Sequence, residues 1–419
     1  MTVARTVRGE RKRLSRSVIP LLTSEASLKR AIRRHFRSLG FVTRNGELML
    51  NELNKDAIRE LHRVHRRDKL LASKALLTRG SSLIQYIASG SDVVPDAIRP
   101  RLEVIDSKGW QSDLFAFASL YWSVPTSHGY GRRIRFLCWD DSNGKLLGLL
   151  ALGDPVFNLA VRDSFIGWSG KDRVKRLACT MDAYVLGALP PYNTLLCGKL
   201  LACLLKSREV SAAFRKRYGN KRTIIASRKE RRHLAMITTS SSLGRSSVYN
   251  RLKLEGEIFL CALGMTRGYG HFHVPHRLFN QMRAYLISLG HDYANGHRYG
   301  EGANWRMRVI REALTSLGLS PRLLRHGIGR EVFACELAPN AGAYLRGEVK
   351  HLRRRALQSV GTISERALRR WVIPRSERDQ SYRSWNREDF FAEIGAGCEP
   401  KAARHSEGVT GSAAEEADC

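Results

Sequence analysis

Residues 177–206 read LACTMDAYVLGALPPYNTLLCGKLLACLLK, and the fold depends on this stretch. Its first half is apolar without alternation, which is typical of a strand buried on both faces of a sheet. Pro190 and Pro191 end that pattern. Asn193 or Thr194 can then cap a helix, because leucines follow at a spacing of four, at Leu196, Leu200 and Leu204. We therefore predict a central strand that passes through a short loop into a buried helix.

The first N–H groups of this helix, near Tyr192, Asn193 and Thr194, are expected at the carboxyl end of the strand. Unpaired N–H groups in that position can bind an anion such as a pyrophosphate. These three residues are accordingly candidate cofactor-binding residues. A strand and a helix that only pack together are the alternative, because the loop is not rich in glycine.

The composition points to a polyanionic partner. Among 419 residues, 71 are Lys or Arg and 39 are Asp or Glu, which gives a net charge of +32. Such a surplus indicates nucleic acid, for which we expect DNA, whereas a merely solvated basic surface is the alternative. No apolar run approaches the roughly 20 residues of a membrane span. The eight cysteines form no CxxC pair, which argues against a zinc ribbon and favours a cytoplasmic protein with free thiols.

Two basic segments are candidates for phosphate contact. Residues 54–77 are predicted to be helical, and with the preceding helix and an Asn45-Gly46 hairpin they form either a winged DNA-binding module or a charged helical platform. The second segment follows residue 347 and is also predicted to be helical. The nucleic-acid-binding candidates are Arg63, Arg66, Arg67, Arg353, Arg354, Arg355, Arg369 and Arg370.

Two loops carry the remaining site candidates. Strands are predicted at 115–124, 132–141 and 146–153, and the loop after them contains Asp154, Arg162, Asp163 and Trp168, which form either a substrate site or a structural ion pair. A short strand is expected at 223–227. A hydroxyl-rich loop then precedes a helix with Tyr249, and its phosphate-binding candidates are Ser242, Gly244, Arg245 and Ser246. Ser246 as a simple helix cap is the alternative.

The histidines give no firm metal site. His271 and His273 are expected on one face of a strand, and His276 follows them, but no carboxylate or cysteine is near. We predict no metal. A metal-dependent nuclease using Asp154, Asp163 or Asp182 is the weakest hypothesis, since nothing brings two carboxylates to one metal.

Two resemblances extend this interpretation. The order of strands, the element at 177–206 and the helix expected at Tyr249 look like a GNAT-type acyltransferase core. The segments GDPVFNLAVRDSFIGWS, ALPPYNTLLCGKLLA, SSSLGRSSVYNRL and GHFHVPHRLFNQMRAYL resemble the DruA family of bacterial Druantia anti-phage defence systems, over about residues 30–290. The DruA resemblance implies a role in phage restriction alongside other subunits, including a large helicase.

The GNAT resemblance implies acyl-CoA as a cofactor, with Gly198 in the pyrophosphate loop and Tyr249 as general acid, so that Tyr249, Asp163 and Asp182 are the catalytic candidates. Working acetyltransferases usually have Gln or Arg, two residues, Gly, one residue, then Gly or Ala in that loop, and here only Gly198 is present. Whether the protein is an enzyme therefore stays open.

The sequence predicts a mixed α/β (α+β) fold in four parts. Residues 1–105 are a basic arm and a helical region, 106–290 a GNAT-like mixed-sheet core, 291–394 a basic helical extension and 395–419 a disordered tail. The expected function is a nucleic-acid-binding defence component, and the alternative is an acyltransferase that modifies nucleic acid or protein.

Overall fold

The computed structural model describes residues 24–45, 47–50, 54–106, 108–126, 131–219, 232–296, 303–354 and 357–396. The chain divides into two compact units. The first combines Met1–Ser38 with His276–Pro321, and the second combines Leu39–Pro275 with Arg322–Cys419. The basic arm at 1–20, the strand expected at 223–227 and most of the expected tail lie outside the described residues. The four-part division of the sequence stays a prediction.

The second unit is built on a seven-stranded sheet in the order β10-β11-β7-β6-β5-β4-β3. Only β6 and β7 run parallel, and the other neighbours are antiparallel. The strands are β3 (Pro100–Val104), β4 (Arg133–Asp140), β5 (Lys145–Gly153), β6 (Thr180–Ala188), β7 (Met236–Ser240), β10 (Cys261–Met265) and β11 (Glu331–Glu336). The predicted mixed α+β class and the central strand after residue 177 are therefore confirmed.

The helix after β6 begins later than predicted. It is α7 (Cys197–Leu204), and the residue before it, Leu196, has a left-handed backbone with φ 62°. The N–H groups of Asn193 and Thr194 donate to the carbonyls of Leu189 and Pro191 at 2.9 and 3.1 Å. Asn193 and Thr194 therefore belong to turns that are closed by these backbone hydrogen bonds. Neither residue caps a helix.

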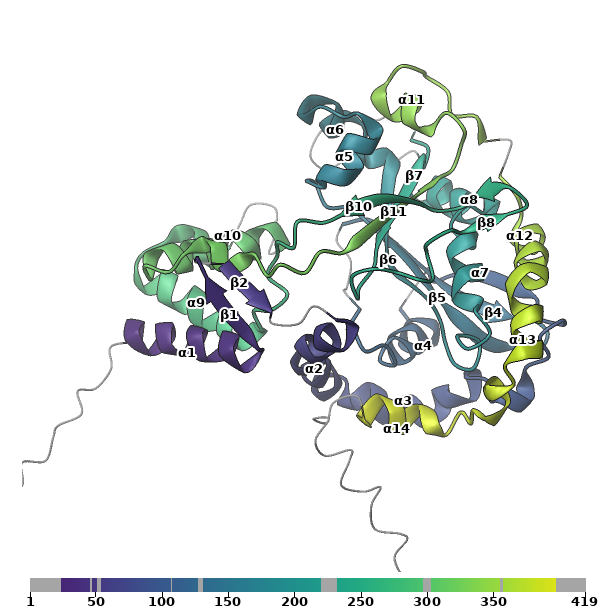
Figure 1. Cartoon of the computed structure of the whole chain (residues 1–419), viewed down its shortest axis with the longest axis horizontal. Coiled ribbons are helices and arrows are strands. Elements are labelled where there is room, and N and C mark those ends of the chain that lie inside the picture. The colour runs from purple at the N-terminus through teal and green to yellow at the C-terminus, as the bar shows by residue number, and fades with distance from the viewer. Residues whose placement is uncertain are drawn as a thin grey trace, which may run out of the picture. The chain divides into compact units, whose positions relative to one another are not determined.

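Helices cover both faces of the sheet (Figure 1). On one face, α7 packs in a single core with α8 (Arg208–Tyr218), α12 (Val360–Ala367) and the π-helical turn Leu368–Val372 that leads to α13 (Ile373–Arg378). The other core includes α3 (Lys74–Leu83), α4 (Trp110–Ala118) and α14 (Asp389–Ala396). Alternate residues of β4 and β5 enter the two cores, as the pleat of a strand requires.

Beyond the ends of the central strands, a third core joins α5 (Ala160–Ile166) and α11 (Ala341–Arg346), beside α6 (Gly170–Arg176). The remaining elements of this unit are the hairpin β1 (Phe41–Arg44) and β2 (Glu47–Leu50), α2 (Lys55–Ala72) and the short pair β8 (Lys253–Leu254) and β9 (Glu257–Ile258). The hairpin is as predicted, whereas the single helix predicted at 54–77 is two helices, α2 and α3, which meet at Ser73.

Four local predictions are wrong. The strand expected at 115–124 is helix α4 and its following turns, because a short apolar run does not separate a buried helix from a strand. The strand expected at 268–274 consists of bends and a turn with an isolated bridge between Tyr269 and Arg325, and the helix expected at Tyr249 is a turn. Residues 237–240, expected in a loop, belong to β7, whose hydroxyl-rich end resembles loop sequence.

The first unit contains α1 (Ser24–Ser38), α9 (His276–Ser288) and α10 (Ala303–Ser316), close to the helices that the sequence predicts at 27–39, 277–289 and 304–317. Leu28, Ile32 and Phe36 form the buried stripe of α1. Helix α1 belongs to this unit, whereas the hairpin and α2 belong to the other, and the winged module stays a prediction. No helix in the described ranges has both the length and the apolar character that crossing a bilayer demands.

Candidate functional site

A cleft opens where the two parallel strands separate. The last paired residues of β6 and β7 are Asp182 and Thr238. Beyond them, side chains take the place of strand pairing: Thr239 Oγ1 donates to the carbonyl of Ala183 at 2.9 Å, and the Tyr249 hydroxyl donates to that of Leu186 at 2.8 Å. The cleft has a volume of about 620 Å³, within the range of small-molecule sites.

Side chains from five parts of the second unit line this cleft. They come from β6, the segment after β7, the loop that follows α4, the start of α7 and the first turns of α2, together with Arg330 before β11. Sites at the carboxyl ends of parallel strands are common, because the strands diverge there and leave room for a ligand. The sheet therefore positions residues that are far apart in the sequence.

The cleft is cationic. One acidic residue, Asp182, lines it, together with five basic residues: Lys55, Arg59, Lys199, Arg245 and Arg330. Arg59 is paired with Asp56 at 2.7 Å, and Lys199 lies 5.6 Å from the ring centre of Trp371. Within the described part of the chain, Arg245, Lys55 and Arg330 have no carboxylate partner. Arg330 is recessed, and burial lowers the pKa of its guanidinium.

Asp182 is the acidic group of the cleft. It keeps partial access to solvent, and Thr238 Oγ1 donates to its Oδ1 at 2.8 Å. Burial raises the pKa of this carboxyl to about 6, although the Thr238 hydrogen bond and the charge of Arg162 act in the opposite direction. A carboxyl that titrates near neutral pH can exchange a proton with a ligand.

Tyr249 lines the same cleft but lies on a turn rather than a helix. Its phenol donates to the carbonyl of Leu186, and burial raises its pKa well above the usual value. The structure thus gives the phenol a partner for its proton. The role of Tyr249 as a general acid stays a prediction.

Part of the hydroxyl-rich segment lines the cleft, and its binding of phosphate stays a prediction. Ser242, Arg245 and Ser246 line the cleft, and Gly244 lies between them with φ 85°. The hydroxyl of Ser246 accepts the N–H of Tyr249 at 3.1 Å, and its own N–H donates to Glu331 at 3.0 Å. Ser246 therefore caps a turn, whereas the alternative drawn from the sequence was a helix cap.

The predicted cofactor residues are only partly together. Asn193 and Gly198 line the cleft, but Thr194 is not among the lining residues. Tyr192 is fully buried, and its hydroxyl donates to Asp140 at 3.0 Å and accepts from Asn143 at 2.9 Å. The hydroxyl of Tyr192 thus has a structural role that the sequence did not indicate.

Arg162, Asp163 and Trp168 lie together, away from the cleft lining. Asp163 accepts from Arg162 at 2.6 Å and from Arg173 at 2.6 Å, and all of Arg162 is buried. Arg162 also donates to the carbonyls of Val156 and Phe157. Trp168 is buried and donates to the carbonyl of Leu345 at 2.7 Å. The geometry favours the structural ion pair over the substrate site.

The histidines considered for a metal site do not all belong to one unit. His273 is buried beside the carbonyl of Leu323 at 3.1 Å, and His276 begins α9 in the other unit. Asp154 is paired with Arg132 at 2.7 Å. Throughout the described ranges, no three His, Cys, Asp or Glu side chains are grouped so that they could hold a metal ion. The nuclease hypothesis gains no support from this arrangement.

The family of the chain follows from sequence comparison. The family model described as "Druantia protein DruA" matches residues 52–347. Druantia protein DruA of Escherichia coli (strain UMEA 4076-1) is 49% identical over 376 residues, which cover 89% of this chain and 93% of that protein. The chain belongs to the DruA family. This supports the expected place in a Druantia defence system, and no solved structure matches.

The residues matched by the family model include the whole cleft lining, from Lys55 to Arg330, and leave out the strongly cationic helix α1. Lys29 on α1 is paired with Glu25 at 2.6 Å. The other cations of α1 are exposed and have no acidic partner in the described residues; this α1 arginine group is Arg30, Arg33, Arg34 and Arg37. The sequence could have indicated the α1 arginine group, because its arginines alternate along the helix with the buried residues Leu28, Ile32 and Phe36.

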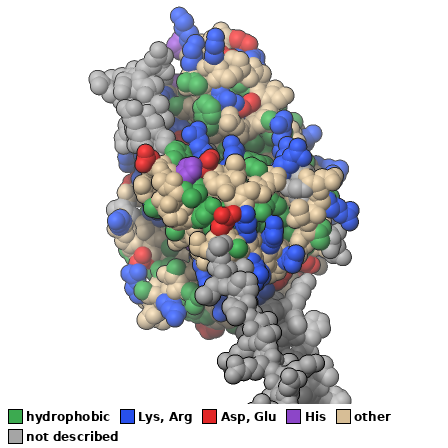
Figure 2. All heavy atoms as spheres, turned by 90° about the vertical axis from the view of Figure 1, so that its left-hand side faces the viewer, with side chains coloured by type: hydrophobic (Ala, Val, Ile, Leu, Met, Phe, Trp, Pro, Cys, Tyr) green, Lys and Arg blue, Asp and Glu red, His purple; other side chains and the backbone are tan. Residues whose placement is uncertain are grey.

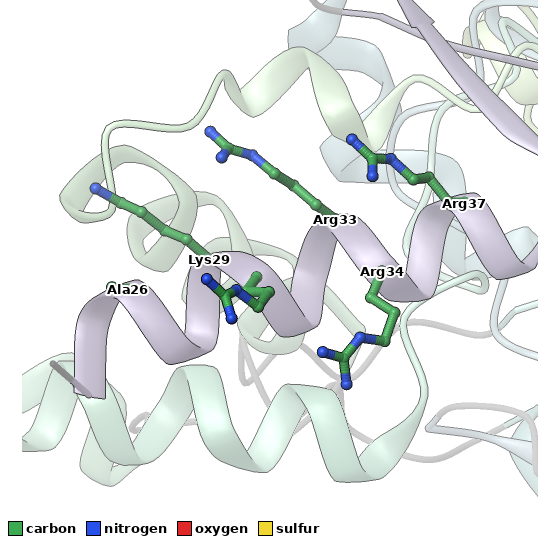
Figure 3. Close-up of a pocket in the computed structure, with 6 residues that line it drawn as sticks. Ala26, Lys29, Arg33, Arg34 and Arg37 are labelled. Carbon is green, nitrogen blue, oxygen red and sulfur yellow. The ribbon is translucent and has the colours of Figure 1, made fainter. Parts of the chain in front are cut away.

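The close-up in Figure 3 shows how these side chains project. Lys29, Arg33 and Arg37 extend to one side of α1, and Arg34 extends to the other. Together with Arg30 they border an open hollow of about 640 Å³. On the face drawn in Figure 2, Lys and Arg side chains appear in several places, with few acidic ones among them.

The basic residues predicted from sequence have different environments. Arg66 is buried and donates to the carbonyls of Glu393 and Ile394 at 3.0 and 3.2 Å, which fixes α14. Arg63 is paired with Glu60, and Arg67 is exposed. In the second segment, Arg369 and Arg370 are exposed on the π-helical turn, Arg353 and Arg354 do not lie on an α-helix, and Arg355 is outside the described residues. Arg66 is therefore not placed to contact phosphate.

Proposed function

We propose that this DruA-family protein is the nucleic-acid-binding component of a Druantia anti-phage defence system, with DNA as its target. The observation that carries the proposal is the α1 arginine group, which presents four guanidinium groups without acidic partners in the described residues. The resemblance to Druantia systems adds other subunits, including a helicase, as expected partners.

The charge of the first unit supports this assignment. Within its described residues the acidic side chains are Glu25, Asp292 and Glu312, and Glu25 is paired with Lys29. Exposed cations that are not neutralised locally gain most from a polyanion, because binding releases the counterions condensed on the phosphates. Residues four apart on a helix lie about 6 Å apart along its axis, so Lys29, Arg33 and Arg37 reach several phosphates of one strand.

Fluorescence anisotropy with labelled DNA tests the proposal. In a variant with all four arginines of the α1 arginine group changed to glutamine, we expect weaker binding at every salt concentration. The slope of log K against log salt should become shallower by about 3 to 4, close to 0.9 for each phosphate that the variant no longer neutralises. Duplex and single-stranded probes of equal length show which form is preferred.

The matched control removes four arginines that already have acidic partners, namely Arg79, Arg101, Arg346 and Arg375. Its net charge equals that of the α1 variant, so general electrostatic attraction falls equally in both. An equal loss of affinity and slope in the two variants would show that α1 is not the binding surface.

A second candidate function is acyl transfer. It is favoured by the cleft beside the parallel strand pair, which Tyr249, Asn193 and Gly198 line. The acyl-CoA in this candidate function is what the resemblance to a GNAT-type core implies, and the cleft offers a place for it. In that case Tyr249 would protonate the leaving thiolate, and its hydrogen bond to Leu186 would have to be exchanged for one to sulfur.

Thermal unfolding in the presence of acetyl-CoA tests this candidate. A ligand that binds the folded state at 100 times its Kd stabilises by about 2.7 kcal/mol, which is easily detected. Stabilisation that is lost in Gly198→Trp would support acyl transfer, since a bulky side chain there enters the cleft. No stabilisation at millimolar acetyl-CoA would count against it.

A further inference from the structure

We infer that the cleft between β6 and β7 binds a nucleotide, with its phosphate at the cationic side chains and its base between Trp122 and Asp182. This site is in the second unit, whereas the α1 arginine group is in the first, so the inference stands apart from the proposed DNA contact. The nucleotide comes either from solution or from an unpaired position of a nucleic-acid strand.

The need for an anion follows from Arg330. This guanidinium is recessed in the cleft wall, and it lies 5.5 Å from the ring centre of Phe272. No carboxylate in the described residues pairs with it. A recessed charge without a counterion is costly, and a phosphate is the anion that an arginine fork matches best. Arg245 and Lys55, also without acidic partners in the described ranges, line the same cleft.

The size and the walls of the cleft suit a base attached to that phosphate. A volume of about 620 Å³ exceeds what a lone phosphate fills. One wall carries Trp122, whose ring lies against Gly187: a Cβ built on Gly187 would come within 3.0 Å of the indole. Trp122 is only half-buried and lines the cleft, and stacking on an aromatic ring is a usual way to bind a base.

Asp182, in the cleft lining, can recognise the base through a hydrogen bond. Asp182 uses Oδ1 to accept from Thr238, and its Oδ2 has no hydrogen-bond partner within the described residues. A free carboxylate oxygen accepts an amino group, such as those of adenine, cytosine and guanine. The cleft therefore combines a ring surface, an acceptor and a set of cations, which is the combination that a nucleotide requires.

Isothermal titration of the full chain with AMP, adenosine and inorganic phosphate tests the inference. We expect AMP to bind more tightly than either fragment. Arg245→Gln should weaken AMP about 10-fold, the loss of one charge-assisted hydrogen bond, and leave adenosine unchanged. Trp122→Leu should weaken AMP and adenosine alike. Arg267→Gln, which removes an exposed arginine outside the cleft lining, is the matched control and should bind as wild type.

Competition separates the two sources of nucleotide. If a single-stranded oligonucleotide displaces AMP, the site takes a nucleotide of a strand, and if it does not, the site takes a free nucleotide. The glutamine variant of the α1 arginine group should bind AMP normally, so failure of the DNA proposal leaves this result intact. The inference is overturned if neither AMP nor the oligonucleotide binds, if acetyl-CoA binds and AMP does not, or if Arg245→Gln and Trp122→Leu both bind AMP as wild type does.

Discussion

Thr238 and Asp182 form the last residue pair of the parallel strands, and the threonine hydroxyl donates to the carboxylate at 2.8 Å. This hydrogen bond marks the point where β6 and β7 separate. The strand pair ends with a recessed carboxyl, and the other residues that line the cleft lie beyond it or opposite it. A change at Asp182 is therefore expected to affect both the stability of the sheet and the chemistry of the cleft.

Asp182→Asn should stabilise the protein at pH 7.5 and leave its stability unchanged near pH 4. Because burial raises the pKa of the native carboxyl to about 6, the native state binds more protons than the unfolded state between about pH 4 and 6. Stability of the wild type thus falls as pH rises through this window. We expect a gain of about 1–3 kcal/mol for the asparagine variant, measured by urea unfolding. A difference that does not change with pH would contradict this.

Asp163→Ala should destabilise the fold strongly. The change leaves Arg162 and Arg173 without the carboxylate they share, and removing one partner of a buried ion pair costs about 3–5 kcal/mol. Chemical denaturation measures the effect. Asp96→Ala, at an exposed aspartate, is the control and should stay within about 0.5 kcal/mol of wild type. If Asp163→Ala were as stable as wild type, a catalytic role for Asp163 would again be favoured.

Tyr192→Phe should lower the free energy of unfolding by about 1–2 kcal/mol, because the buried carboxylate of Asp140 loses a hydrogen-bond donor. Tyr86→Phe is the matched control: its ring stacks on Trp110, and its hydroxyl has no hydrogen-bond partner in the described residues. Thermal unfolding compares the two variants. Unchanged stability of Tyr192→Phe with weaker ligand binding would instead identify the hydroxyl as part of a binding site.

The variants Arg66→Gln and Arg67→Gln should have different effects, the first on stability and the second on DNA affinity. Arg66 donates to carbonyls of α14 from a buried position, so its loss should cost about 1–3 kcal/mol of stability. Arg67 is exposed, so its loss should leave stability unchanged and act only on DNA affinity. Unfolding curves and anisotropy titrations on the same two preparations test this. If both variants lost DNA affinity equally and neither lost stability, Arg66 would instead be part of the DNA-binding surface.

The local sequence pattern correctly predicted those elements that each have a single strong signal. The unbroken apolar run became β6, the turn signal near Asn45 was followed by the pairing of β1 with β2, and the leucines spaced by four became α7. Errors arose where the same residues suit two structures. The run from Phe115 onward is as apolar as a strand, and only its packing against Leu83 and Phe390 identifies it as a helix.

The sequence by itself determined the basic character of this protein, its central strand and its membership of the DruA family, because these follow from composition and from the order of residues along the chain. Only the tertiary structure decided which charged residues share a site. Asp182 and Asp163 look alike in sequence, yet one faces a cleft and the other is held between two arginines. Arg66 and Arg67 are adjacent, yet one is buried. The reason is that a side chain's partners are set by the packing of distant segments, which local pattern does not encode.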